Sequence, residues 1–176
     1  MLFVELAVAS RAVAASSKRS EKVARFADVF GRLAPEEVEA AIAFSTGTTR
    51  HGRIGVGWAT LRDVRPVPAS VPEQSISDVD RAISELAAIS GQGSQTRRRD
   101  VLRELLARAT EPEQVMLVSI IGGELRQGAL DGVVTAAVAK AAEVAVGSVQ
   151  RGAMFAGSLP TAARVALTTG NSGLAA

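Results

Sequence analysis

The sequence predicts an all-α fold, a compact single domain of about eight to ten helices. Hydrophobic residues make up 47% of the 176 residues while aromatic residues make up only 3%, and the excess is largely Ala, Leu and Val. That composition favours closely packed helices of small residues. Apolar residues recur at helical spacing in successive segments, and no alternation of apolar and polar residues is convincing enough to predict a strand.

The helices expected in the first half follow from periodicity and from residues that favour a helix start. Val23, Phe26 and Phe30 lie at helical spacing, and Pro35 is tolerated in the first turn of a helix. The expected helices run from Leu2 to about Ala14, from the Ser16-Ser17 break to about Leu33, from Pro35 to about Phe44, and from Trp58 to about Arg62.

Residues 65–75 contain three prolines and resemble a surface linker. The first 64 residues alone would form a small and poorly buried unit. We therefore expect a crossover loop inside one domain that covers residues 1–170, followed by a frayed tail at residues 171–176.

Capping signals mark the helices of the second half. Ser77 with Asp80 predicts one helix start, and Thr110 with Glu113 has the spacing of a capping box. The first of these helices is expected to end near Ser90. The helices after it are expected at about residues 96–109, 112–122, 131–144, 148–156 and 159–168.

Several classes of site are excluded or disfavoured. The chain has no Cys, so disulfide scaffolds and thiolate zinc sites are excluded. The single histidine, His51, lies in a Gly/Arg loop and is interpreted as a solvated side chain, and no Ser lies in a nucleophile elbow. No run of about 18 apolar residues occurs, so we expect no membrane partner. The absence of Cys fits a reducing cytoplasm, and without a convincing active site we expect no cofactor or metal in this chain.

Positive residues are clustered although the net charge is only +2. Residues 11–25 carry five cations against the one acid Glu21, and residues 97–99 are all Arg. Each cluster has two interpretations, a solvated helix face or a surface that binds a polyanion.

The stretch from Gly91 to Gly128 favours the polyanion interpretation. Helix N-termini and Gly-rich turns expose unpaired backbone amides, which bind phosphates without regard to base sequence. In GQGSQTRRR, the glycines permit close approach of the backbone, Ser94 and Gln95 offer neutral donors, and Arg97 and Arg98 supply charge. Helix capping is the alternative explanation of the glycines, and the two roles are compatible.

These residues resemble the N-terminal DNA-binding domain of ATP-dependent DNA ligases, and the compact chain looks most like a bacterial, actinobacterial-type member. The family has a GxGSQ-(K/R)-(K/R) loop leading into LLxxLL, then an acid at the next helix start and a Leu-Arg-x-Gly step. The corresponding residues here are Gly91, Gly93, Ser94, Gln95, Arg97 and Arg98, then Leu102, Leu105 and Leu106, then Glu113, and finally Leu125, Arg126 and Gly128. SSKRSEKVARFADVF resembles the family's basic helix, with Arg19 and Lys22 in the basic positions, and IGVGW resembles its Gly-rich middle loop.

The resemblance implies a helical domain that straddles the minor groove on both sides of a nick and contacts the sugar-phosphate backbone. It implies roles for the parent enzyme in DNA repair, replication and recombination, with ATP and Mg as the parent's cofactors and with adenylation and OB domains absent from this chain. The implied DNA-binding residues are Arg19, Lys22, Gly93, Ser94, Gln95, Arg97, Arg98, Gly123, Arg126 and Gly128.

The family's catalytic lysine has no counterpart here. Adenylation requires a Lys-x-Asp-Gly setting, whereas Lys18, Lys22 and Lys140 are followed by RSE, VAR and AAE. We therefore expect this chain alone to have no catalytic residue and no enzymatic activity.

Three alternatives to a ligase domain stay open. An independent enzyme is the least favoured of them, because no catalytic constellation is present. An all-α protein-interaction module would use the same Ala/Leu helices but does not explain cations beside glycines. A helix-turn-helix regulator would need a recognition helix, for which residues 97–108 are a candidate.

Overall fold

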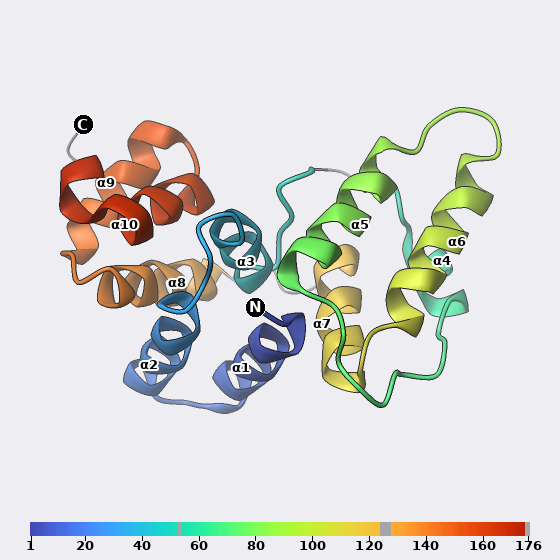
Figure 1. Ribbon diagram of the computed structural model, residues 1–176, viewed down its shortest axis with the longest axis horizontal. Helices are drawn as coiled ribbons and strands as arrows, with labels where there is room; N and C mark the ends of the chain where they lie inside the picture. The colour runs from blue at the N-terminus through green and yellow to red at the C-terminus, as the bar shows by residue number, and fades with distance from the viewer. Residues whose placement is uncertain (53, 124–127, 175–176) are drawn as a thin grey trace.

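The computed structural model describes residues 1–52, 54–123 and 128–174 (Figure 1). Within those ranges the chain forms ten helices and no strand beyond one isolated bridge, so the predicted all-α fold is confirmed. The helices are α1 (Phe3–Ala15), α2 (Arg19–Phe30), α3 (Val38–Ser45), α4 (Trp58–Asp63), α5 (Ile76–Ala88), α6 (Ser94–Ala107), α7 (Glu111–Gly122), α8 (Gly128–Ala141), α9 (Val146–Ala156) and α10 (Leu159–Leu174).

The helices lie in two groups (Figure 1). Helices α1, α2, α3, α8, α9 and α10 form one group, in which α2 packs against α8, and helices α4 to α7 form the other. The groups meet where α1 packs on α7, where α3 contacts α5, and where Leu2 pairs with Ser75. The first group therefore joins segments from both ends of the chain around one shared core.

Helix α3 lies at the centre of that core. Every residue of α3 except Glu39 is buried, as expected for a short helix that is apolar on all sides and must be covered by its neighbours. The ring of Phe44 meets that of Phe3 edge to face, with centroids 5.9 Å apart. Because α3 also contacts α8 and α10, it connects the loop that follows it to the whole first group.

The capping boxes explain two helix starts in the second group. The Thr110–Glu113 box is confirmed: the backbone N of Thr110 donates to Glu113 Oε2 at 2.7 Å. The start predicted from Ser77 and Asp80 was wrong by two residues, since Ser75 is the N-cap and exchanges hydrogen bonds with Asp78. Ser75 has the extended backbone that an N-cap requires, and this shift lets Ile76 enter the core.

Two other boundaries differ from expectation. The third helix begins at Val38 and not at Pro35, because residues 35–37 form a turn. Helix α10 continues to Leu174, beyond Thr168, so residues 171–174 of the expected frayed tail are helical. The kink at Gly170, with φ of 63°, redirects the chain so that Leu174 packs against Gly152 of α9. Residues 175–176 lie outside the described residues.

The Pro-rich segment joins α4 to α5 without a helix and lies along α6 and α7. The backbone N of Ala69 donates to the carbonyl oxygen of Ala109 at 2.9 Å. The side-chain amide of Gln114 donates to the carbonyl oxygen of Pro66 at 3.2 Å, and that of buried Gln74 donates to Leu105 at 3.3 Å. These hydrogen bonds satisfy backbone and side-chain polar groups of a segment that forms no helix or strand of its own.

Candidate nucleic-acid interface

A glycine-rich loop, described at residues 46–52 and 54–57, joins α3 to α4 and connects the two groups of helices (Figure 1). Its glycines at 47, 52 and 55 have φ values of 74°, 65° and 68°, a region that side chains with a Cβ rarely adopt. The loop lines an open hollow of about 780 Å³, whose other side is formed by Ile120 and Ile121 of α7.

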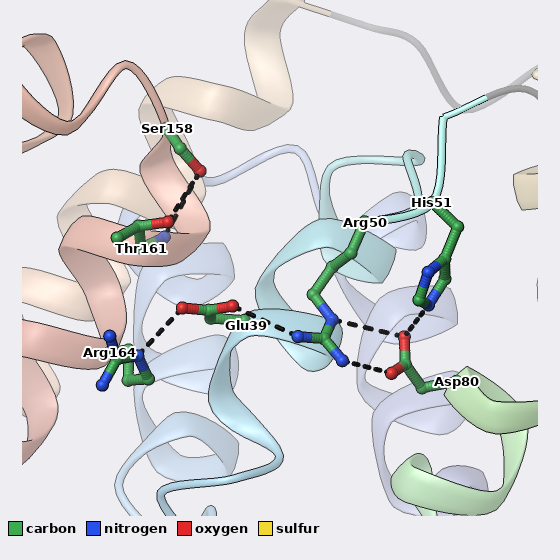
Figure 2. Close-up of polar contacts among 7 residues, drawn as sticks. All are labelled: Glu39, Arg50, His51, Asp80, Ser158, Thr161 and Arg164. Atoms are coloured by element: carbon green, nitrogen blue, oxygen red, sulfur yellow. Dashed lines mark hydrogen bonds and ion pairs between the residues drawn. The ribbon is translucent and has the colours of Figure 1, made fainter. Parts of the chain in front are cut away.

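Ionic contacts hold this loop in place (Figure 2). The guanidinium of Arg50 pairs with both carboxylate oxygens of Asp80 on α5, and its Nη1 donates to Glu39 Oε2 on α3 at 3.2 Å. The hydrogen bond to Asp80 is the main reason that the pKa of Arg50 is raised above its ordinary value. The loop is thus clamped to a helix of each group, which fixes the shape of the hollow beside it.

His51 takes part in the same clamp, so its interpretation as a freely solvated side chain was wrong. Its Nε2 lies 3.0 Å from Asp80 Oδ1, and its side chain is only 22% exposed (Figure 2). The sequence contained no signal for this contact, because Asp80 belongs to a distant helix. In the described parts of the chain, no group of three or more His, Asp or Glu residues is arranged to hold a metal ion.

A second hollow of about 570 Å³ lies on the other side of the clamp. Glu39 accepts from Arg164 Nε of α10 at 2.9 Å as well as from Arg50, and Ser158 accepts from the backbone N of Thr161 at 3.4 Å (Figure 2). The cations at this hollow are therefore paired with carboxylates. The hollow has little net positive charge to offer an anion, and its polar groups hold α3, α5 and α10 together.

The start of α6 has the geometry that an exposed amide turn requires. Gly93 is the N-cap and has φ of 74°, and Gly91 has φ of 78°. Apart from adjoining backbone and chain neighbours, no atom lies within 4 Å of the position that a Cβ would take at either glycine, so both backbones are open to an approaching ligand. Ser94 is half-buried and Gln95 is exposed in the first turn of α6.

Arg97 and Arg98 both fold back onto the loop that precedes α6. Arg97 Nη2 donates to the carbonyl oxygens of Ser90 at 2.7 Å and Gln92 at 3.4 Å. Arg98 Nη2 donates to the carbonyl oxygen of Ile89, and its guanidinium carbon would lie 2.8 Å from a Cβ placed at Gly55. Arg98 Nε is buried and has no hydrogen-bond partner among the described residues.

The two arginines therefore differ. Arg97 is an exposed cation, as expected for a surface group. Arg98 is half-buried, and its guanidinium braces the glycine-rich loop at Gly55. The loop can pass this closely over a guanidinium because residue 55 is Gly.

The other predicted residues lie in the first group of helices or near its border. Arg19 Nη2 donates to the carbonyl oxygen of Gly132 on α8 at 2.9 Å and stays exposed, whereas Lys22 is half-buried. Gly123 caps α7 with φ of 74°, and Gly128 is the first residue of α8. Arg126 lies outside the described residues.

The structure thus gathers the predicted residues into two sets. The α6 set comprises Gly93, Ser94, Gln95, Arg97 and Arg98, and the α2 set comprises Arg19 and Lys22 with the start of α8. The sets belong to different groups of helices (Figure 1). Sequence reasoning missed Gly55 as the contact of Arg98 and Asp80 as the anchor of the loop. The two closely spaced glycines of IGVGW were a signal that backbone packing there is tight, but they could not identify the partner.

Comparison with known proteins identifies the family. Residues 59–139 match the family model described as DNA ligase N terminus. A probable DNA ligase of Anaeromyxobacter dehalogenans is 48% identical to this chain over 178 residues, which cover 99% of this chain and 35% of that protein. Probable DNA ligases of Mycolicibacterium gilvum and Rhodococcus jostii are 46% and 44% identical, over 99% and 100% of this chain.

The chain belongs to the DNA ligase N-terminal family. It spans about a third of the length of these curated relatives, 34% to 35% of each. The ligase domain therefore corresponds to a part of those proteins. Among its described residues, no single helix has the length and apolar character needed to cross a membrane. Residues Leu130–Ala141 of α8 and Val146–Ala156 of α9 reach that length and character only when taken together, and they are bent by 115°.

Proposed function

We propose that this chain binds duplex DNA independently of sequence, with a preference for nicked duplex, through minor-groove contacts to the sugar-phosphate backbone. The observation that carries the proposal is the α6 set. Arg97 and Arg98 donate to carbonyl oxygens, which carry no net charge, so both cations keep their full charge beside open glycine turns. Fixed cations next to exposed amides suit phosphate groups.

The second set supports the proposal through its position. Arg19, the first residue of α2, contacts Gly132 of α8 in the other group of helices, so a duplex that meets both sets would be held along its length. The minor groove carries little sequence information, and a protein that seals nicks in any context needs none.

The proposed role of this domain is that of the DNA grip of an ATP-dependent DNA ligase that works in replication, repair and recombination in the cytoplasm. The adenylation and OB domains of the longer ligase would be its partners and would supply the chemistry with ATP and Mg. The chain alone would bind DNA without sealing it, because none of its lysines has the Lys-x-Asp-Gly setting.

The test is a titration of this chain with nicked, intact and single-stranded DNA of two unrelated sequences at two salt concentrations. Salt-sensitive duplex binding that is equal for both sequences, and equal or stronger at the nick, supports the proposal. A strong preference for one sequence would favour the helix-turn-helix alternative. Absence of binding at low salt would reject a DNA grip.

The protein-interaction alternative has one observation in its favour. Met154 and Phe155 at the end of α9 are 82% and 89% exposed, an unusual position for two large apolar side chains. Salt-insensitive binding of a protein partner, with no effect of DNA, would support this second function.

A further inference from the structure

Trp58, the only tryptophan of the chain, is exposed beside the glycine-rich hollow. It is the first residue of α4 and directly follows Gly57, which lines the hollow. Its exposed fraction is 48%, whereas the four phenylalanines of the core are at most 1% exposed. A half-exposed indole is unusual in a chain with so few aromatic residues, and exposed aromatic side chains often mark a surface that contacts a partner.

The indole rests on Gly122 of α7. A Cβ placed at Gly122 would lie 3.1 Å from Trp58 Cζ2 and 3.5 Å from Cε2. Gly122 is the last helical residue of α7, so its backbone does not require glycine, and glycine inside a helix costs about 1 kcal/mol relative to Ala. A Cβ at residue 122 would require the indole to shift by a few tenths of an ångström, so this glycine lets the ring pack closely on α7.

Arginine side chains and the backbone of the glycine-rich loop lie near Trp58. Arg62 is exposed one helical turn further along α4, on the same face as Trp58. The guanidinium of Arg98 lies against Gly55, three residues before Trp58. An aromatic side chain among cations and open glycines matches a polyanion that also carries apolar surface, and the DNA backbone, with its phosphates and deoxyribose rings, is such a polyanion.

We propose that Trp58 packs its exposed indole face against a deoxyribose of the bound duplex, between phosphates held by the α6 set and by Arg62. This inference rests on the DNA binding proposed above and adds an apolar contact to it. A rigid flat ring that is already in place buries sugar surface with little loss of conformational entropy. Because every nucleotide carries the same sugar, the contact adds affinity without sequence preference.

The single tryptophan makes the test direct, because all intrinsic tryptophan emission comes from Trp58. The unaltered chain is titrated with a nicked duplex while the anisotropy of a dye on the DNA is followed in parallel. We expect the Trp58 emission to change at the same midpoint as the anisotropy, to become protected from acrylamide, and to change equally for two unrelated sequences.

Two variants and one control complete the test. Trp58→Ala should bind the duplex about tenfold more weakly, which is the size of the effect of removing one aromatic side chain that stacks on a nucleic acid, and Trp58→Phe should recover part of that affinity. Phe155→Ala removes an aromatic side chain that is even more exposed but lies on α9, and it should bind like the unaltered chain.

The outcomes separate this inference from the proposed function. Absence of any anisotropy change would reject DNA binding and, with it, the proposed contact of Trp58 with the duplex. Normal anisotropy with unchanged Trp58 emission, or with Trp58→Ala binding as tightly as the unaltered chain, would overturn the Trp58 contact alone. An emission change that depends on base sequence would overturn the sugar contact in favour of a base contact.

Discussion

The two basic sets differ in how the protein holds their cations. In the α6 set, Arg97 and Arg98 donate to carbonyl oxygens of the loop directly before their own helix. In the α2 set, Arg19 also donates to a carbonyl oxygen, but that of Gly132 on a different helix, α8, and Lys18, which precedes Arg19, is paired with the carboxylate of Glu21 at 3.1 Å. A carbonyl contact orients a cation without neutralising it, whereas a carboxylate contact does both.

This difference shows that the number of cations in a cluster is a poor guide to the charge that it presents. Lys18 is paired with Glu21, and on α6 Arg99 is paired with Asp63 at 3.4 Å, so neither side chain presents its full charge. Arg97 and Arg98 contact carbonyl oxygens and are not neutralised by them. The glycine-rich loop connects the two groups of helices that carry these sets, so its anchoring should determine whether they act together.

The largest expected effect comes from breaking the clamp of this loop. Asp80→Ala leaves Arg50 and His51 without their shared carboxylate, and we expect it to lower the free energy of unfolding by about 2 kcal/mol. This value is below that of a fully buried pair because the Arg50 side chain is 35% exposed. Urea unfolding measures the decrease, with Asp28→Ala, which removes a surface partner of Arg32, as a control that should change little.

Replacement of Arg98 should destabilise the protein more than replacement of Arg97. Arg98→Ala removes a half-buried guanidinium that bonds Ile89 and packs under Gly55, and we expect the free energy of unfolding to fall by about 1.5 kcal/mol. Arg97→Ala removes an exposed side chain and should cost less than about 0.5 kcal/mol. Equal melting temperatures for the two variants would contradict the bracing role of Arg98.

Measurements of DNA affinity on variants of each set compare the contributions of the two sets to binding. Arg97→Ala and Arg19→Ala should each weaken binding to all duplexes alike and flatten the slope of log affinity against log salt by about 0.9 for each phosphate that the variant no longer neutralises. The slopes come from titrations at several salt concentrations on two sequences. If only Arg97→Ala changes the slope, the α2 set does not contact the duplex.

The smallest expected effect is the pH dependence of the α2 region. The pKa of Glu21 is lowered from its ordinary value of 4.5, first by the hydrogen bond from Ser16 and then by Lys18. A lowered folded pKa means that the stabilisation by Glu21 is fully present above pH 4.5 and is lost as the pH falls below that value through the folded pKa. The melting temperatures of the unaltered chain and of Glu21→Gln, measured from neutral to acid pH, should therefore differ at neutral pH and converge at acid pH. A difference in melting temperature that stays constant across this pH range would refute the contribution of Glu21.

Helix existence and helix ends could be predicted where the signal is local. The Thr110–Glu113 box was predicted because both members lie in one turn, and Ser75 was missed because Ser77 and Asp80 offered the same spacing two residues later. Leu174 was assigned to a frayed tail because its stabilising partner, Gly152, lies on another helix.

The amino-acid sequence by itself determined the helical class, the family resemblance and the residues of the α6 set, because periodicity, capping and short motifs act over a few neighbouring residues. Only the tertiary structure decided that Arg98 supports Gly55, that His51 and Arg50 share Asp80, and that Gly122 makes room for Trp58. The physical reason is that each of these contacts joins residues from separate elements, whose proximity depends on how the helices pack and not on any local pattern.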